Sequence, residues 1–87
     1  MTAPIPHDAE TERALLGALL LNPEAIRTLR LLPMDFYIVR NRYVFEAMLA
    51  IAARKETVDY LVLVKALEQT GQLGEVGGAG YITSLVT

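Results

Sequence analysis

Glycines cluster between residues 71 and 81, at the start of a predicted helix. A glycine-rich turn that leads into a helix can bind phosphate, because its backbone N–H groups are exposed and the helix dipole attracts anions. The same turn can instead be a structural joint, because glycine adopts positive φ angles without steric cost. The side chains around the turn distinguish a nucleotide site from a joint.

Those side chains do not match a nucleotide site. A Walker-type loop needs Gly-Lys-Ser or Gly-Lys-Thr, in which the lysine reaches the phosphates, but Gly80 is followed by Tyr81. The dinucleotide fingerprint needs a preceding strand and a third glycine, and Thr83 stands at the position of that glycine. We therefore expect no cofactor-binding residue, and we interpret Gly77 and Gly78 as a close turn between two helices.

Residues that serve catalysis or metal binding elsewhere are isolated in this chain. His7 is the single histidine and there is no cysteine, so neither a multi-histidine site nor a thiolate site is available. Ser84 has no base to activate it. The carboxylates of Glu10 and Glu12 point to different sides of a helix. The sequence thus predicts no catalytic residue, no metal site and no enzymatic activity of the chain itself.

Basic residues are concentrated in the middle of the chain. Six of them face two acidic residues between positions 27 and 55, whereas the flanking segments are acidic and the net charge of the chain is −2. A basic middle can contact a nucleic-acid backbone or an acidic partner, or it can be a solvated face. Interleaved aromatic and basic residues, typical of base stacking, are absent. The candidate partner-contact residues are Arg40, Arg42, Arg54 and Lys55.

Length and composition indicate one cytoplasmic domain. The 87 residues, 53% of them hydrophobic, are enough to bury a modest core. No apolar run is long enough to cross a membrane, and the first ten residues lack the basic and apolar regions of a signal peptide. We expect no membrane partner.

Apolar residues recur with helical spacing along the whole chain. Asp8 and Asp59 are suited to cap the first and fourth helices, and Asn22-Pro23 is interpreted as the cap and first residue of the second. Gly17 interrupts a helix and therefore predicts the close approach of another helix. The expected fold is all-α, a small orthogonal bundle of about five to six short helices in a single domain. The predicted helices cover residues 9–21, 23–31, about 40–53, 60–70 and a segment from 78 onward.

Two aromatic residues lie between the second and third predicted helices. The segment from Pro33 to Tyr37 is too short for a conventional helix and too aromatic for a free loop, so we expect the rings of Phe36 and Tyr37 to enter the core. Asp35 is interpreted as a cap for this turn, and Arg42 should lie opposite the apolar face of the next helix. The other expected core residues are Leu15, Leu16, Leu19, Leu20, Ile26, Leu29, Val44, Phe45, Met48, Ile51, Ala52, Tyr60, Leu63, Val64, Leu67, Val76, Tyr81, Ile82 and Leu85.

Residues in a consistent order along nearly the whole chain match the pattern of one known family. They are Pro6-His7-x-x-Glu10-x-Glu12, Leu15-Leu16-Gly17, Leu20-Leu21, Phe36-Tyr37, Arg42, Phe45-x-Ala47-Met48, Val58-Asp59, Leu63, Leu67 and Gly71-x-Leu73-x-x-Val76-Gly77-Gly78-x-x-Tyr81-Ile82-x-x-Leu85. With these residues the chain resembles the N-terminal domain of the bacterial replicative DNA helicase of the DnaB type. Two positions depart from the pattern: Asn41 stands where histidine is common, and Val62 where threonine is frequent.

The resemblance implies that residues 1–87 are the head domain of a ring-shaped hexameric motor. In that family the N-terminal domains form a collar around the DNA channel, help the hexamer to assemble, and take part in recruiting primase and loading factors. A helical hairpin, a linker helix and a C-terminal ATPase domain follow, and ATP and Mg²⁺ belong to that ATPase domain. The implied partners are other helicase subunits, primase and a helicase loader, with DNA contacted through the full hexamer.

Two alternatives stay open at this point. A helicase-interacting domain of a primase has a related helical fold, and an adaptor domain unrelated to replication would have a similar composition.

Overall fold

The computed structural model describes residues 8–87, so the expectation that His7 helps to start the first helix lies outside the described residues. These residues form five α-helices and one short 3₁₀ helix, without a strand among them. The elements are α1 (Ala9–Leu21), α2 (Ala25–Thr28), η1 (Pro33–Asp35), α3 (Val39–Ala53), α4 (Tyr60–Gln69) and α5 (Gly78–Ser84). The predicted all-α bundle is confirmed.

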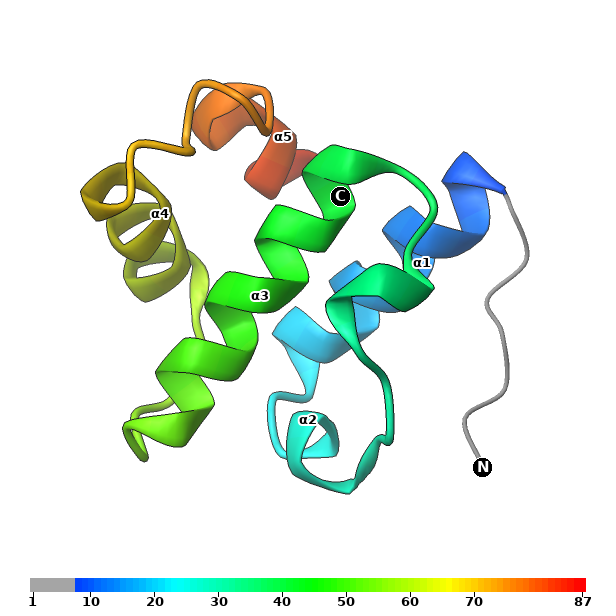
Figure 1. Ribbon diagram of the computed structural model, residues 1–87, viewed down its shortest axis with the longest axis vertical. Coiled ribbons are helices and arrows are strands. Elements are labelled where there is room, and N and C mark those ends of the chain that lie inside the picture. Colours follow the sequence, from blue (N-terminus) through cyan, green and yellow to red (C-terminus); the bar gives the residue numbers. More distant parts are fainter. Residues whose placement is uncertain (1–7) are drawn as a thin grey trace.

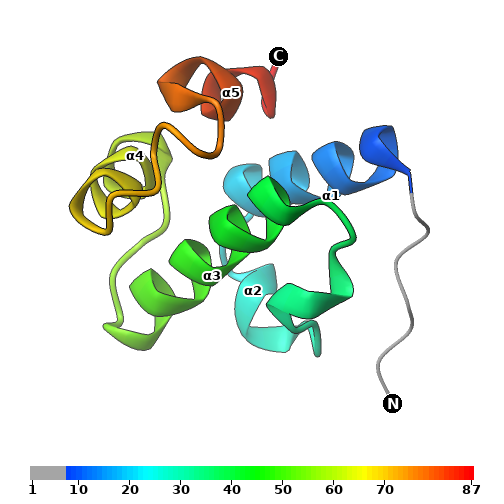
Figure 2. The same ribbon diagram turned by 45° about the horizontal axis from the view of Figure 1, so that its top comes forward.

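Helix α3 is the central element of the bundle. It runs between α1 and α4, while α2 and η1 pack beside it and α5 lies at one end of the molecule (Figures 1 and 2). Its predicted apolar face is confirmed, since four of its side chains are fully buried in the common core. These side chains are Val44, Phe45, Met48 and Ile51.

Two aspartates begin helices as the sequence predicts. A side-chain oxygen of Asp8 accepts a hydrogen bond from the N–H of Glu10 at 2.9 Å, and that of Asp59 accepts one from Val62 at 2.9 Å. Each satisfies a backbone donor that the first helical turn leaves without a partner. Val58 and Leu63, at the two positions of a hydrophobic staple around Asp59, are both buried.

The second helix is much shorter than expected. Helix α2 comprises only four residues, and Glu24 stands at its N-cap position without a side-chain capping bond, so the prediction that Asn22 caps it is wrong. The hydroxyl of Thr28 donates to the carbonyl of Ala25 at 3.1 Å, a local bond of the kind that competes with helix propagation. The chain then becomes extended at Leu29, which is 38% exposed and not in the core as predicted.

The connector around η1 buries one aromatic ring instead of two. Phe36 is fully buried and its ring lies 5.1 Å from that of Phe45, centroid to centroid. Tyr37 is 59% exposed, so the prediction that it enters the core is wrong. The backbone at Phe36 is extended, and successive side chains of extended backbone point to opposite sides.

Two smaller expectations also need correction. The carboxylate of Asp35 accepts from the N–H of Leu32 at 2.7 Å, so it caps the start of η1 and not the turn at Phe36. Tyr60 is 38% exposed because it is the first residue of α4, where buried Val58 already covers the core.

The predicted role of the glycines in tight packing is confirmed. Gly77 and Gly78 have φ angles of 103° and 74°, and the N–H of Gly78 donates to the carbonyl of Leu73 at 2.8 Å. Gly17 faces the backbone carbonyl of Leu85, directly after α5, and a Cβ atom at this position would overlap that oxygen. Glycine is therefore required where α1 meets the end of α5.

Replacement of Phe36 by alanine should destabilise the domain by about 3–5 kcal/mol, because it removes a fully buried ring from the core. Tyr37→Ala is the matched control and should cost about 1 kcal/mol or less, since its ring is exposed. Urea denaturation followed by circular dichroism measures both changes. Equal losses for the two variants would contradict the assignment of one buried and one exposed ring.

Two glycine substitutions in helices should have opposite effects. Gly17→Ala should cost about 1–3 kcal/mol, because the new methyl group forces α1 away from the carbonyl of Leu85. Gly80→Ala meets no atom within 4 Å and has no positive φ, so it should raise the free energy of unfolding by up to about 1 kcal/mol. Thermal unfolding of both variants tests this pair, and a neutral Gly17→Ala would contradict the close approach.

Candidate functional site

The four basic residues predicted to contact a partner lie at opposite ends of α3. Arg40 and Arg42 belong to its first four residues, whereas Arg54 and Lys55 follow its last residue. At about 1.5 Å per residue, the helix separates the two pairs by roughly 20 Å. The residues therefore form two separate surfaces and not one basic stripe, and their contact with a partner stays a prediction.

The guanidinium of Arg42 is engaged inside the domain. Its Nε donates to the carbonyl of Phe36 at 2.6 Å, and its Nη2 donates to that of Tyr37 at 3.4 Å. The side chain is half-buried and lies along the connector before α3. Carbonyl groups in an extended connector have no helical N–H partner, and the guanidinium of Arg42 provides hydrogen-bond donors for them.

Arg40 contacts the last helix. Its guanidinium carbon lies 4.5 Å from the centroid of the Tyr81 ring, which is a cation–π distance. The contact joins the first turn of α3 to α5.

At the other end of α3, Arg54 and Lys55 differ in their surroundings. Arg54 forms an exposed ion pair with Glu56, with 3.2 Å between Nη2 and Oε1. Lys55 has a φ angle of 61° and is the one non-glycine residue with positive φ among residues 8–87. It lines a hollow together with Arg27 of α2.

A buried carboxylate lies at the centre of the domain. Glu12 of α1 is fully buried. Its Oε2 accepts from the N–H of Tyr37 at 2.7 Å, and its Oε1 accepts from the N–H of Ile38 at 3.3 Å and from Nδ2 of Asn41 at 2.9 Å. A buried charge is tolerated when several donors surround it, and here two donors from the connector and one from the first turn of α3 do so.

Asn41 extends these hydrogen bonds to α5. It is also fully buried, and its Oδ1 accepts a hydrogen bond from the hydroxyl of Tyr81. We call the side chains of Glu12, Asn41 and Tyr81 the buried polar network. It joins α1, α3 and α5, and all of its hydrogen bonds stay within the domain, so its role is to hold the helices together.

The spacing of Glu12 was a signal for this network. Glu12, Leu16 and Leu19 follow the i, i+4, i+7 pattern of one helix face, and both leucines are buried. The exposed Glu10 lies on a different side of the helix, as the sequence predicts. The donors to the carboxylate of Glu12 come from residues 37–41. The sequence pattern does not predict these long-range hydrogen bonds.

Ser84 is occupied by a local bond. Its hydroxyl donates to the carbonyl of Tyr81 at 2.6 Å. Among residues 8–87 there is no group of three or more histidine, aspartate or glutamate side chains that could hold a metal ion. No helix in the described part of the chain has the length and apolar character to cross a membrane.

Comparison with known proteins identifies the family. The family model of the DnaB-like helicase N terminal domain matches residues 4–87. The chain belongs to this family. It is therefore an N-terminal domain of the replicative DnaB-like helicase type.

Similar proteins support the DnaB-like assignment. The chain is 39% identical to the replicative DNA helicase DnaB of Geobacillus stearothermophilus and 38% identical to the replicative DNA helicase DnaC of Bacillus subtilis, in each case over 92% of its length. It spans only 18% of either relative. A crystal structure of the N-terminal domain of DnaB helicase from Mycobacterium tuberculosis matches with a TM-score of 0.87 at 34% identity, over 94% of this chain and 61% of that one.

The buried polar network explains how a DnaB-like domain accommodates asparagine at position 41. The family pattern commonly has histidine there, and the site needs one donor toward Glu12 and one acceptor for Tyr81. The amide of Asn41 provides both, through Nδ2 and Oδ1. A neutral imidazole also has one donor and one acceptor nitrogen, so either side chain can join the same two partners.

Replacement of Glu12 by glutamine tests the buried polar network. The variant keeps the shape of the side chain but turns an amide NH₂ toward backbone donors, so it should destabilise the DnaB-like domain by about 2–3 kcal/mol. Glu10→Gln, two residues away on the exposed side of α1, should change stability by about 0.5 kcal/mol or less. Urea denaturation measures both, and similar values would contradict a structural role for the buried carboxylate.

Proposed function

We propose that this domain is the N-terminal head of a hexameric replicative DNA helicase, where it serves collar assembly and the docking of primase or a helicase loader. The observation that carries the proposal is the match of nearly the whole chain to DnaB N-terminal domains, in sequence and in fold. The similar curated proteins are named replicative DNA helicases. Their names favour the helicase over a primase domain or an unrelated adaptor.

The parent protein would then be an ATP-dependent DNA helicase acting in the cytoplasm. ATP and Mg²⁺ would bind its C-terminal ATPase domain, and DNA would pass through the assembled hexamer. The head domain would contribute a rigid surface for other subunits and for partner proteins. A fully packed core and a glycine joint without phosphate-binding side chains suit such a role.

The isolated 87-residue chain should behave as a docking module and not as a motor. We expect it to sediment as a monomer or weak dimer and to hydrolyse no ATP, because the family builds its collar with a hairpin outside these residues. Sedimentation velocity at micromolar concentration and a phosphate-release assay measure the two properties. A stable hexamer, or turnover of ATP, would overturn this division of roles.

The gene product that carries this domain provides the decisive test. We expect it to form hexamers, to hydrolyse ATP in the presence of DNA, and to be stimulated by its own primase. Deletion of residues 1–87 should keep the ATPase activity but remove the stimulation by primase. A gene product that neither assembles nor unwinds DNA would contradict the proposed function.

A further inference from the structure

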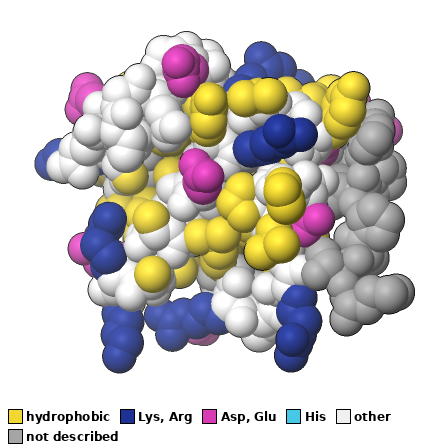
Figure 3. Space-filling model, viewed as in Figure 1, with side chains coloured by type: hydrophobic (Ala, Val, Ile, Leu, Met, Phe, Trp, Pro, Cys, Tyr) yellow, Lys and Arg dark blue, Asp and Glu magenta, His cyan; other side chains and the backbone are white. Residues whose placement is uncertain are grey.

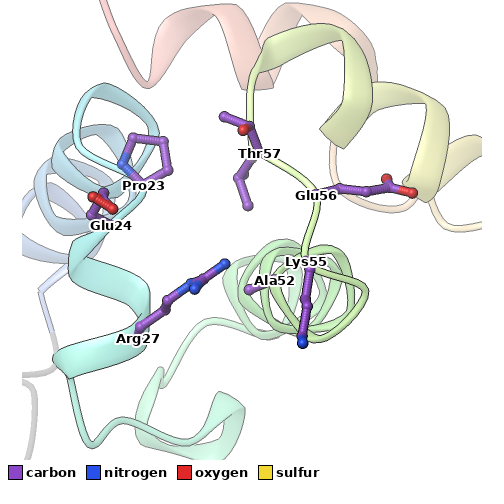
Figure 4. Close-up of a pocket in the computed structure, with 8 residues that line it drawn as sticks. Pro23, Glu24, Arg27, Ala52, Lys55, Glu56 and Thr57 are labelled. Carbon is purple, nitrogen blue, oxygen red and sulfur yellow. The ribbon is translucent and has the colours of Figure 1, made fainter.

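A hollow of about 220 Å³ lies between α2 and the loop that joins α3 to α4. Figure 4 shows α2 residues on one wall, the loop residues on the other, and Ala52 of α3 between Arg27 and Lys55. Lys and Arg side chains project along the lower edge of the molecule (Figure 3), where α2 and the C-terminal end of α3 lie (Figure 1). The lining residues are Pro23, Glu24, Arg27, Ala52, Lys55, Glu56, Thr57 and Val58.

The two cations that border the hollow have no partner within residues 8–87. Neither the side chain of Arg27 nor that of Lys55 forms a hydrogen bond or an ion pair there, and both are exposed. Glu56, the adjacent acidic residue, is paired with Arg54 and points away from the hollow (Figure 4). The loop therefore does not compensate the charge of Lys55, and Glu24 is the remaining carboxylate that lines the hollow with the two cations.

The backbone of Lys55 is a second, independent observation. The residue follows the C-cap of α3 with a left-handed φ angle of 61°, and its N–H donates to the carbonyl of Ala52 at 2.9 Å. Helices commonly place glycine at this position, because other residues are strained there. Strained backbone conformations cluster at functional sites, so a lysine at this position indicates a function for its side chain.

Three apolar residues lie among the polar ones that line the hollow. Val58 is buried in the core, and Pro23 and Ala52 are half-buried beside it. An apolar surface between two cations fits an extended segment in which an apolar residue has a carboxylate two positions before it and another two positions after it, because alternate side chains of an extended segment point to the same side.

A nucleic-acid backbone fits the hollow less well. Two cations line the hollow, which are too few to follow a continuous row of phosphates, and no aromatic residue lines it to stack on bases. The charge pattern thus favours discrete carboxylates of a protein.

We propose that this hollow, which we call the α2–α3 hollow, docks an acidic segment of a partner protein. Carboxylates of the segment pair with Arg27 and Lys55, and an apolar side chain near them packs against Ala52 and Val58. The inference rests on the proposed docking function, to which it adds the surface and the chemistry of the partner.

A peptide titration of the ¹⁵N-labelled chain tests the proposal. The probe is acetyl-Gly-Glu-Gly-Leu-Gly-Glu-Gly-amide, its basic counterpart has lysine in place of glutamate, and a twelve-nucleotide oligothymidylate represents nucleic acid. The acidic peptide should produce saturable shifts confined to amides of residues 24–27 and 52–58. The basic peptide and the oligonucleotide should produce none there.

Charge variants locate the binding site. Arg27→Glu and Lys55→Glu should each weaken the binding of the acidic peptide by about fivefold or more. Lys65→Glu reverses an exposed lysine on α4 and should weaken it by less than about twofold. Equal effects of Lys55→Glu and Lys65→Glu would reduce the binding to general charge attraction and overturn the proposal.

Lys55→Gly separates binding from folding. Glycine relieves the left-handed strain, so the melting temperature should rise while peptide affinity falls. Unchanged affinity in this variant, no saturable shift with the wild type, or tighter binding of the oligonucleotide to the same amides would each overturn the proposal.

The parent helicase distinguishes this inference from the proposed function. If Arg27→Glu leaves hexamer formation and all partner stimulation intact, the α2–α3 hollow is not the docking surface and the proposed function stands. If the gene product neither assembles nor unwinds DNA, the proposed function fails whatever the peptide does.

Discussion

The fold depends on the need to compensate one buried charge. A carboxylate removed from water must receive hydrogen bonds from nearly every direction, or the folded state loses several kcal/mol. Glu12 meets this need with two backbone N–H groups and one amide, all from residues 37–41. These bonds hold α1 against the point where α3 begins. The carboxylate also faces the N-terminal end of a fifteen-residue helix, where the dipole favours negative charge.

The remaining arrangement follows from this anchor. With its backbone N–H turned toward Glu12, Tyr37 has its ring largely in solvent, while Phe36 on the opposite side fills the core. Asn41 also accepts a hydrogen bond from Tyr81, and the guanidinium of Arg40 lies over the ring of the same tyrosine. Helix α5 is thereby fixed to α3 on one side. On the other side Gly17 admits the carbonyl of Leu85 against α1.

The functional consequence is a rigid domain with distinct ends. The first turn of α3 is occupied by contacts with α1, η1 and α5, so its arginines serve the fold. At the opposite end, the side chains of Arg27 and Lys55 have no partner among residues 8–87, and Lys55 is held in an unfavourable backbone conformation. The docking role that we propose requires such a contrast, because a stable core must present side chains whose interactions are still available.

Local sequence determined most of the helix ends, and the short α2 is the exception. Asp8, Asp59 and Gly71 define boundaries through bonds and φ angles within a few residues of themselves, and Gly77 and Gly78 define the joint before α5 in the same way. Apolar spacing identified the core face of α3. The ordered pattern of residues also identified the family. These features could be predicted because each depends on neighbours in the chain.

Tertiary structure alone decided which polar groups are buried and which cations are available. Glu12 receives its donors from residues at least 25 positions away. Arg42 donates to carbonyl groups of the connector, whose position in the fold does not follow from the sequence around Arg42. The four arginine and lysine residues grouped by sequence are separated by the length of α3, while Arg27 joins Lys55 across the α2–α3 hollow. Such pairings depend on how the helices cross, and crossing is set by the packing of the whole core. The sequence of one segment therefore does not identify the residues that will pair with its charged groups.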